Sequence, residues 1–200
     1  MLWIYRTSLG QDHHRFITST DNSYPEHGDS PHKTHNAPAI STQKPADTPA
    51  DNRPLVLAGV EISGPPLAGN SDADVVLHAL CNAISGVSGV NFLGPPADEL
   101  CNTGVINSEI YVMKALEDLY EVRPGCELVH LSISLEGKRP KLWDHIPKMK
   151  DNLSRILNLP VSDIGLTATT GEGLTGMGRG EGLACLVILT LREPDNTSQG

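Results

Sequence analysis

A long polar segment near the start of the chain constrains the fold more than any other feature. Residues 18–53 contain five prolines and no Val, Leu, Phe, Trp or Met. Such a segment cannot bury enough apolar surface to offset the entropy lost on ordering, so we expect a disordered insertion with solvated histidines at His27, His32 and His35. The stretch before it, WIYRTSL, alternates like a strand but is too short to be a domain. It must pair with a segment beyond the insertion, and residues 54–62 (PLVLAGVEI) are the predicted partner.

The composition predicts one acidic domain. The 200 residues are 38% hydrophobic, which suits a single core, so we expect one domain over residues 1–192 and a flexible tail at 193–200. A formal net charge of −9 argues against nucleic acid and against an anionic membrane as partners. Four scattered cysteines favour a reducing compartment, and we see neither a signal peptide nor a membrane-spanning run. The expected location is cytoplasmic.

Strands and helices alternate along the remainder of the chain. Helical spacing of apolar residues predicts helices over 71–89, with Ser71 or Asp72 as N-cap, over 108–120 and over the stretch KMKDNLSRILN. Further strands are predicted at 126–137, 163–170 and 182–192. The last of these is so apolar that we expect it to be buried on both faces. The predicted fold class is α/β (α+β), a single sheet with helices packed on one side.

A carboxylate and two adjacent histidines end the first predicted strand. Alternate strand positions point to one face, so Asp12 and His14 can converge while His13 points away. His78, on a predicted helix, is the candidate third partner. Two histidines and one carboxylate leave one coordination position open, as in catalytic zinc sites. Asn82, one turn later, is placed to fix the His78 tautomer. The alternative for His78 is a satisfied histidine of the core.

A glycine-rich stretch, TATTGEGLTGMGRGEGLA, precedes the last predicted strand. Its G-x-G-x-x-G pattern lacks the following helix of a dinucleotide-binding unit, because the sequence is too rich in glycine for a helix. Thr169, Thr170 and Glu172, with free backbone amides, suit a phosphate and a divalent cation. A wide hairpin connection is the alternative.

The densest basic cluster of this acidic chain is Lys138, Arg139 and Lys141, directly after a predicted strand. Its cations and backbone suit a nucleotide or phosphate, and a solvated turn is the alternative. Trp143 and His145 are expected to pack at a helix start rather than to bind a ligand.

Together these motifs resemble the 2-C-methyl-D-erythritol 2,4-cyclodiphosphate synthase family of the non-mevalonate isoprenoid pathway. The family's D-x-H, S-D-x-D-x-x-x-H, P-K-hydrophobic-x-x-H-I-P, A-T-T-x-E and G-R-G-E-G motifs occur here in the family's order. They match residues 12–14, 71–78, 140–147, 168–172 and 178–182. The resemblance covers residues 4–16 and 54–192.

The resemblance implies a lyase that converts 4-diphosphocytidyl-2-C-methyl-D-erythritol 2-phosphate to the 2,4-cyclodiphosphate and CMP. It implies a homotrimer around a central axis, with helices on the outer face of each sheet and active sites between subunits. One Zn²⁺ per subunit would be held by Asp12, His14 and His78, and Mg²⁺ or Mn²⁺ would lie near Glu172. Asn70 and Thr170 occupy catalytic positions. The implied substrate-binding residues are Asp12, His13, His14, Asn70, Ser71, Phe92, Leu93, Gly94, Gly137, Lys138, Arg139, Pro140, Lys141, Leu142, Ala168, Thr169, Thr170, Glu172 and Arg179.

Four places depart from the family pattern. Asn70 replaces a histidine that contacts substrate phosphate, and residues 91–94 (NFLG) replace G-D-I-G, whose aspartate binds the erythritol hydroxyls. Gly173 replaces a lysine and Asn82 replaces an aspartate. Because the metal triad is intact, we favour a working enzyme. The alternatives are a trimer that binds an isoprenoid diphosphate or a partner near Arg179, and a metal-dependent hydrolase of another nucleotide diphosphate.

Overall fold

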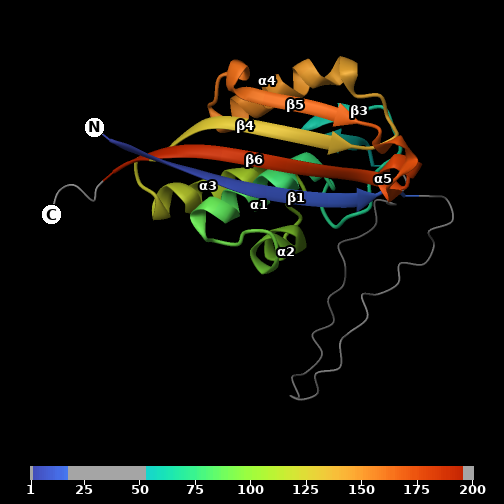
Figure 1. Cartoon of the computed structure of the whole chain (residues 1–200). Helices are drawn as coiled ribbons and strands as arrows, with labels where there is room; N and C mark the ends of the chain where they lie inside the picture. Colours follow the sequence, from blue (N-terminus) through green and yellow to red (C-terminus); the bar gives the residue numbers. More distant parts are fainter. Residues whose placement is uncertain (1, 18–52, 196–200) are drawn as a thin grey trace, which may run out of the picture.

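The computed structural model describes residues 2–17 and 53–195. Four strands form one sheet, and the larger helices cover one of its faces (Figure 1). The predicted fold class and the single-sided packing of the helices are confirmed. The expectations for the polar insertion, including its three histidines, lie outside the described residues.

The sheet has the strand order β1-β6-β4-β5. Its strands are β1 (Trp3–Arg15), β4 (Glu127–Glu136), β5 (Ile164–Thr169) and β6 (Gly182–Pro194). β6 runs antiparallel to both β1 and β4, whereas β4 and β5 are parallel. β1 and β5 are therefore the two edges of the sheet.

The predicted pairing of the first strand with residues 54–62 is wrong. β1 pairs with β6 along its whole length, from Trp3 opposite Pro194 to Arg15 opposite Gly182. Residues 54–62 instead fold back on themselves as a hairpin of β2 (Leu55–Leu57) and β3 (Val60–Ile62). The reason is a tight turn at Ala58 and Gly59, where both residues have positive φ and reverse the chain.

Five α-helices lie within the described residues. They are α1 (Val75–Ser88), α2 (Pro95–Asn102), α3 (Ser108–Val122), α4 (Ile146–Leu157) and the single turn α5 (Gly176–Arg179). The three predicted helices are confirmed, but α2 was not predicted, and α5 forms within the stretch judged too rich in glycine.

The N-cap of α1 is Asp74 rather than Ser71 or Asp72. Its buried carboxylate accepts the N–H groups of Val76 and Leu77, the orphan donors of the first helical turn. The same carboxylate accepts the N–H groups of Ala58 and Gly59 (2.9 and 2.6 Å), so it also holds the β2–β3 turn. Asp74 thereby fixes where α1 starts relative to the hairpin.

Close packing of α1 on β1 is what brings distant residues together at the site. A Cβ at Gly10 would lie 2.0 Å from the carbonyl oxygen of Ala79, so the helix approaches the strand more closely than a side chain would allow. Asp12 follows two residues later on the strand, and His78 precedes Ala79 on the helix. The missing side chain at Gly10 therefore places Asp12 beside His78.

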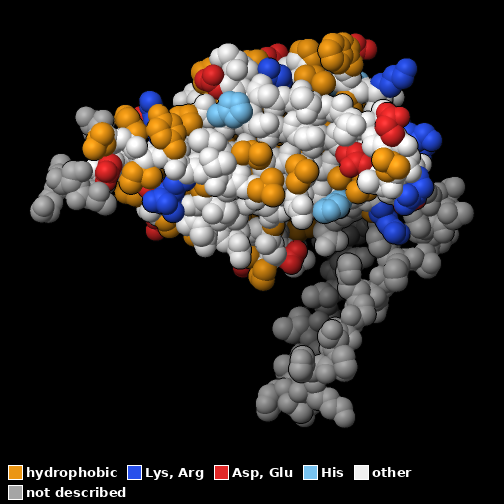
Figure 2. All heavy atoms as spheres, in the orientation of Figure 1, with side chains coloured by type: hydrophobic (Ala, Val, Ile, Leu, Met, Phe, Trp, Pro, Cys, Tyr) orange, Lys and Arg blue, Asp and Glu red, His pale blue; other side chains and the backbone are white. Residues whose placement is uncertain are grey.

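The opposite face of the sheet is open and apolar. The last strand was expected to be buried on both faces, but it alternates, and Leu186 and Ile188 are 46% and 44% exposed. On β1, Leu9 lies opposite Ile188 and Tyr5 lies opposite Arg192, and both side chains are exposed. Figure 2 shows hydrophobic side chains gathered across the middle of this face. The expectation fails for the single chain because the helices cover only one side of the sheet.

The end of the chain differs slightly from the predicted tail. β6 continues to Pro194, and the N–H of Asp195 donates to the carbonyl of Leu2 (3.0 Å). Within the described ranges, none of the helices is both long and apolar enough to cross a bilayer.

Candidate metal centre and active site

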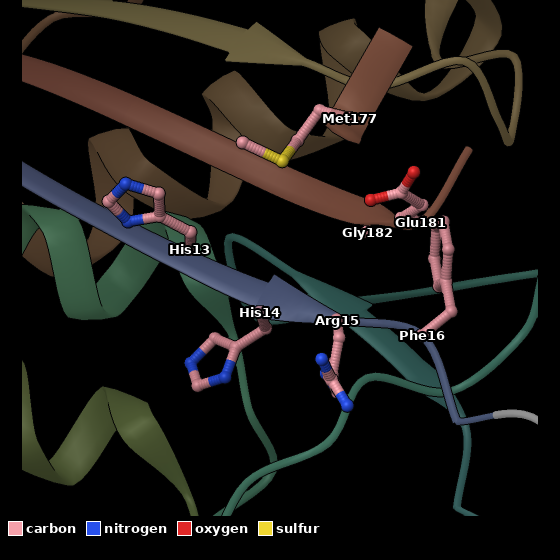
Figure 3. Close-up of a pocket in the computed structure, with 7 residues that line it drawn as sticks. All are labelled: His13, His14, Arg15, Phe16, Met177, Glu181 and Gly182. Atoms are coloured by element: carbon pink, nitrogen blue, oxygen red, sulfur yellow. The ribbon is translucent and has the colours of Figure 1, made fainter. Parts of the chain in front are cut away.

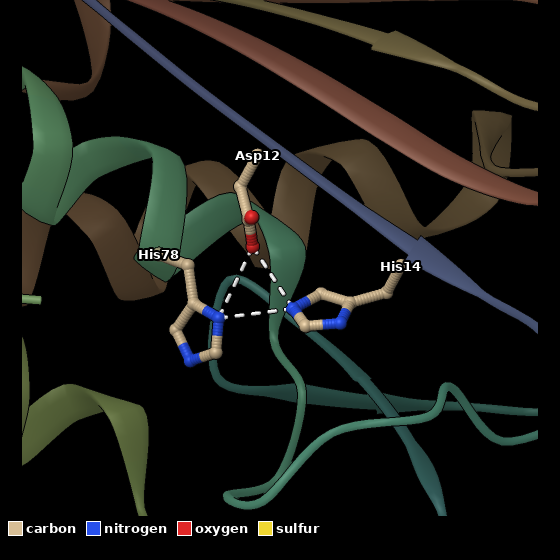
Figure 4. A group of neighbouring side chains, drawn as sticks. All are labelled: Asp12, His14 and His78. Carbon is tan, nitrogen blue, oxygen red and sulfur yellow. Dashed lines mark hydrogen bonds and ion pairs between the residues drawn. The ribbon is translucent and has the colours of Figure 1, made fainter. Parts of the chain in front are cut away.

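Three side chains from two elements converge between β1 and α1 (Figure 4). The Oδ2 atom of Asp12 lies 2.9 Å from Nε2 of His14 and 3.1 Å from Nδ1 of His78. The two ring nitrogens are themselves 3.1 Å apart. The predicted convergence of Asp12, His14 and His78 is confirmed, and each side chain keeps a minor part of its surface exposed.

The hydrogen bonds behind each histidine decide which nitrogen faces the cluster. Nδ1 of His14 lies 2.7 Å from the carbonyl oxygen of Ala68, which can only accept, so Nδ1 carries the proton. Nε2 of His14 therefore presents a lone pair to Asp12 when the ring is neutral. The loop that contains Ala68 is held against β1, because Ala68 N–H donates to the carbonyl of Arg15 (2.9 Å).

The ring of His78 is oriented by two serines, and the sequence analysis predicted this role for neither of them. Its Nε2 lies 3.1 Å from Oγ of Ser71 and 2.9 Å from Oγ of Ser108, and both serines are buried. Ser71 was predicted to bind substrate rather than to orient a ligand, and Ser108 begins α3, thirty residues away along the chain. The predicted role of Asn82 is wrong, because its amide donates to the carbonyl of Gln11 (2.9 Å) instead.

Three atoms that can each offer a lone pair face one another, and a proton or a metal ion between them would stabilise this arrangement. Burial acts to raise the pKa of the Asp12 carboxyl, but hydrogen bonds and positive charge from His14 and His78 outweigh it and hold the pKa well below its usual range. Burial acts to lower the pKa of His14, yet the bond to Asp12, its charge and the Ala68 carbonyl together raise it. Without a metal, a proton supplies the charge.

The donor set fits a metal ion. Two neutral imidazole nitrogens and one carboxylate oxygen are the ligands of an open catalytic zinc site, with the fourth position left for water or substrate. The bonds from Ala68 to His14, and from the serines to His78, are the outer contacts that such ligands need.

His13 lies on the other side of β1, as alternation along the strand predicts (Figure 3). It lines a pocket of about 460 Å³ together with His14, Arg15, Phe16, Met177, Glu181 and Gly182. The structure does not bring His13 into the Asp12 cluster. Arg179, also predicted to bind substrate, forms an exposed ion pair with Glu181 (2.8 Å).

The basic segment and the glycine-rich stretch meet at one end of the sheet, beyond the last residues of β4 and β5. The strands that precede them are parallel neighbours, with Glu136 opposite Thr169, and the N–H of Gly137 donates to the carbonyl of Thr169 (3.0 Å). Lys138, Arg139 and Lys141 are exposed, whereas Leu142 is buried. Residues 137–142 and Ala168, Thr169 and Thr170 therefore lie beside one another, and their role in binding substrate stays a prediction.

Glu172 does not join the Asp12 cluster. Its carboxylate accepts the hydroxyl of Thr170 (Oγ1–Oε1 2.9 Å), and both side chains are exposed beyond the end of β5. Asp12 and His14 lie on β1, at the other edge of the sheet. Two strands, β6 and β4, lie between β1 and β5 in the sheet. The basic segment reaches the end of β1, because the Arg139 guanidinium lies 5.3 Å from the centre of the Phe16 ring.

Asn70 sits on a loop that is held by Arg53. The guanidinium of Arg53 donates to the carbonyl of Ser71 and, at 3.0 Å, to that of Gly69, the two residues that flank Asn70. The Asn70 side chain is exposed. Gly69 packs beside the His14 ring, where a Cβ would lie 3.3 Å from Cε1. Arg53 was not singled out from the sequence, because its carbonyl partners are defined only by the fold.

The apolar side chains of the altered segment at residues 91–94 are turned into the protein. Phe92 is 6% exposed and packs against Tyr111 (ring centroids 6.1 Å apart), and Leu93 packs against the core. Gly94 starts α2 with a φ of 127°. Asn91 is exposed, so a substrate contact here would use the Asn91 side chain or the backbone.

Trp143 does not pack as predicted, since its side chain is 82% exposed, whereas His145 is half-buried. Trp143 directly follows the buried Leu142 in the basic segment.

Comparison with known proteins decides the family. The family model of the YgbB family matches residues 42–192. This chain belongs to the YgbB family. The 2-C-methyl-D-erythritol 2,4-cyclodiphosphate synthase of Chlamydia trachomatis serovar A is 38% identical over 193 residues, which cover 96% of this chain and 90% of the relative. The resemblance inferred from the motifs is confirmed.

Solved structures agree with this YgbB assignment. A structure of 2C-methyl-D-erythritol-2,4-cyclodiphosphate synthase superposes with a TM-score of 0.67 at 29% identity, covering 93% of this chain and 99% of that one. A CDP-bound form of the synthase gives a TM-score of 0.66 at 27% identity, with the same coverage. The YgbB match begins at residue 42 and so does not include β1, the strand that carries Asp12 and His14. The structure shows that β1 is part of the same sheet, since it pairs with β6.

Proposed function

We propose that this chain is a 2-C-methyl-D-erythritol 2,4-cyclodiphosphate synthase. It converts 4-diphosphocytidyl-2-C-methyl-D-erythritol 2-phosphate to 2-C-methyl-D-erythritol 2,4-cyclodiphosphate and CMP. The observation that carries the proposal is the cluster of lone pairs from Asp12, His14 and His78, in a chain 38% identical to a synthase of that name. A site with one open metal position beside an exposed polar loop suits a diphosphate substrate.

The metal ligands are Asp12, His14 and His78, and zinc is the ion that this donor set suits. When bound, Zn²⁺ supplies a Lewis acid that draws charge from the β-phosphate of the substrate. Ala68 holds His14 with its Nε2 lone pair facing the site, and the serines hold His78. The protein thereby prepares the ligand geometry before the substrate arrives.

The chemical step needs no protein nucleophile. An oxygen of the substrate's 2-phosphate forms a bond to the β-phosphorus, the bond from that phosphorus to the bridging oxygen breaks, and CMP leaves with the electron pair. The protein's task is to align the attacking oxygen with the leaving group and to neutralise charge. Asn70 would donate its amide N–H to a phosphate oxygen from the loop held by Arg53. Because that amide is neutral, it orients the phosphate without a charge of its own.

Glu172 and Thr170 would serve the other half of the site. Their hydrogen-bonded pair is exposed beyond the end of β5, where a carboxylate can take a Mg²⁺ or Mn²⁺ that also binds the substrate diphosphate. The cytidine would lie between residues 137–142 and 168–170, with Lys138, Arg139 and Lys141 nearby. The related synthase that was solved with CDP supports a cytidine nucleotide site in this fold.

A complete site requires a second copy of the chain. Within the described residues, the hydrogen bonds of the triad do not reach residues 137–142 or 168–172. We infer that the triad of one subunit meets the nucleotide segment of its neighbour. The open sheet face, with Tyr5, Leu9, Leu186 and Ile188 exposed, is the apolar surface that assembly would cover. A homotrimer around a central axis satisfies both requirements, because each subunit then contributes one half of a site and receives the other half from its neighbour.

Phosphorus NMR on the purified protein tests the proposal. We expect that substrate, Zn²⁺ and Mg²⁺ yield CMP together with coupled cyclic diphosphate resonances, and that His78→Ala protein yields neither. His130→Ala is the matched control, since His130 is exposed on β4. CMP with a linear product would indicate the hydrolase alternative. Unchanged substrate in the presence of bound zinc would refute the synthase and favour a binding protein.

A further inference from the structure

Behind His78 lies a hydrogen-bonded chain that ends on a carboxylate. The Oγ atom of Ser108 lies 2.9 Å from Nε2 of His78 and 2.5 Å from Oδ1 of Asp72. The other carboxylate oxygen, Oδ2, accepts the backbone N–H of Ser108 (2.9 Å). Ser108 is fully buried, and Asp72 lies six residues before His78 in the sequence. Three groups from the loop before α1, from α1 itself and from α3 are thus connected in series.

The proton positions in this chain follow from the chemistry of its members. A carboxylate can only accept hydrogen bonds, and Asp72 accepts from the N–H of Ser108, from its hydroxyl and from the N–H of Asp74 (3.2 Å). The hydroxyl proton of Ser108 therefore points at Asp72. Its oxygen is left with lone pairs only on the side of His78, so Nε2 of His78 must be the donor.

The consequence appears on the other side of the ring. With its proton on Nε2, a neutral His78 presents Nδ1 as a bare lone pair 3.1 Å from Asp12 and from His14. If the Ser108 proton pointed at His78 instead, the ring would carry its proton on Nδ1, which is the nitrogen that faces the metal position. That tautomer cannot coordinate a metal ion through Nδ1.

The geometry points to Asp72 as a positioning residue that acts through Ser108 to hold His78 in its metal-binding tautomer. This inference rests on the proposed metal site and deepens it by assigning the group that controls one of its ligands. Ser71 also contacts Nε2, but at 3.1 Å, and its oxygen already accepts the N–H of Ala73 (3.2 Å). Ser108 is the nearer acceptor and the one whose proton is committed to a carboxylate.

The backbone of Asp72 also ties the metal site to the residues before α3. The N–H of Asp72 donates to the carbonyl of Ile106 (2.9 Å), two residues before Ser108. Asp72 therefore holds the end of the segment that contains residues 91–94 and α2.

The first test measures zinc affinity by competition with a chromophoric chelator. Asp72→Asn replaces one of the two carboxylate oxygens that accept from Ser108 with an amide NH₂, so the serine hydroxyl can turn its proton to His78. Ser108→Ala removes the hydroxyl oxygen that accepts from Nε2 of His78. We expect both variants to weaken zinc binding by about 10- to 100-fold, the usual effect of removing an outer contact of a metal ligand. Ser154→Ala is the control, because the Ser154 hydroxyl donates to the carbonyl of Leu159 (2.6 Å) in α4. Its affinity should equal that of the unchanged protein.

The second test reads the tautomer directly in zinc-free protein. Nitrogen-15 shifts of the His78 ring, recorded at about pH 8.5 where histidine is ordinarily neutral, should show Nε2 protonated in the unchanged protein. They should shift toward protonated Nδ1 in Asp72→Asn. This readout does not depend on activity, and a variant that merely lost stability would not exchange one tautomer for the other.

The outcomes separate the two ideas. If the unchanged protein binds zinc and the Asp72 and Ser108 variants bind it equally well, the positioning role is overturned while the metal site stands. If Ser71→Ala weakens zinc binding more than Ser108→Ala does, Ser71 is the controlling acceptor and the proposal is again overturned. Failure of the unchanged protein to retain zinc would overturn the metal site itself.

Discussion

Nε2 of His14 and Nδ1 of His78 lie 3.1 Å apart, although 64 residues separate the two histidines along the chain. Both nitrogens are turned inward by hydrogen bonds on the opposite side of each ring, to Ala68 and to Ser108. Two lone pairs at this distance, with a carboxylate beside them, repel one another unless a proton or a metal ion lies between them. The cluster is therefore organised around a positive charge.

Removal of one ligand should abolish zinc retention. In His78→Ala, two ligands remain, too few for a stable site, so we expect the zinc content after gel filtration to fall from about one ion per chain to near zero. Elemental analysis measures this, with His130→Ala as the control. An undiminished zinc content in His78→Ala would show that the metal binds elsewhere.

Zinc should stabilise the protein more as the pH rises. In metal-free protein, the raised pKa of His14 contributes stability that is complete below its ordinary value of 6.5 and is lost as the pH rises through the raised value. The lowered pKa of Asp12 contributes stability that is complete at a pH above its ordinary value of 3.8. That stability is lost as the pH falls through the lowered value. Between these limits a proton occupies the cluster and competes with the metal.

The melting temperature with and without zinc tests this competition. At a hundredfold excess of zinc over its Kd at high pH, we expect an increase in Tm of roughly 5 to 10 °C. The same zinc concentration should give a much smaller increase near about pH 6, where His14 holds its proton. A zinc effect that is independent of pH would contradict the assignment of His14 as a ligand.

Arg53 should support catalysis through the loop that carries Asn70. Arg53→Ala leaves the carbonyls of Gly69 and Ser71 without their charged donor. We expect a loss of about 1.5–3 kcal/mol in the free energy of unfolding and a fall in kcat that Arg53→Lys partly restores. Urea denaturation and steady-state kinetics measure the two effects. Arg192→Ala, which removes an exposed ion pair with Glu127, should leave the free energy of unfolding nearly unchanged.

The open face of the sheet should be the assembly surface. Ile188→Asp places a charge among Tyr5, Leu9 and Leu186, so we expect a monomer with little activity by gel filtration with light scattering. Met113→Asp is the matched control, because Met113 is 55% exposed on α3 on the helical side of the molecule. A trimeric Ile188→Asp protein would place the subunit interface elsewhere.

Trp143 should report nucleotide binding. Its indole is 82% exposed directly after the basic segment, and an aromatic ring in that position can stack on a cytosine base. In a Trp3→Phe background only Trp143 remains, so CDP should quench the remaining fluorescence. Calorimetry provides the independent measure of binding, and CDP that binds without quenching would place the base away from Trp143.

The local geometry of the site could be predicted from sequence. Side chains alternate along any strand, so Asp12 and His14 had to share one face and His13 the other. Helical spacing likewise indicated that His78 lies on a helix, and the ordered motifs indicated the family. These inferences depend only on backbone periodicity within a few residues, which is a property of the local chain.

The tertiary structure decided the partners. A strand's neighbour depends on hydrogen bonds and burial across the whole chain, and β1 paired with β6 because residues 54–62 turned back on themselves at Ala58 and Gly59. The contacts of His78 with Ser108, thirty residues away, and of Ser108 with Asp72 arise from the packing of α1 against α3. Sequence determined which residues could bind a metal. Only packing between distant elements determined which nitrogen of each histidine faces the metal position. The reason is that the hydrogen-bond partner on the opposite side of each ring, Ala68 or Ser108, fixes the orientation of that ring.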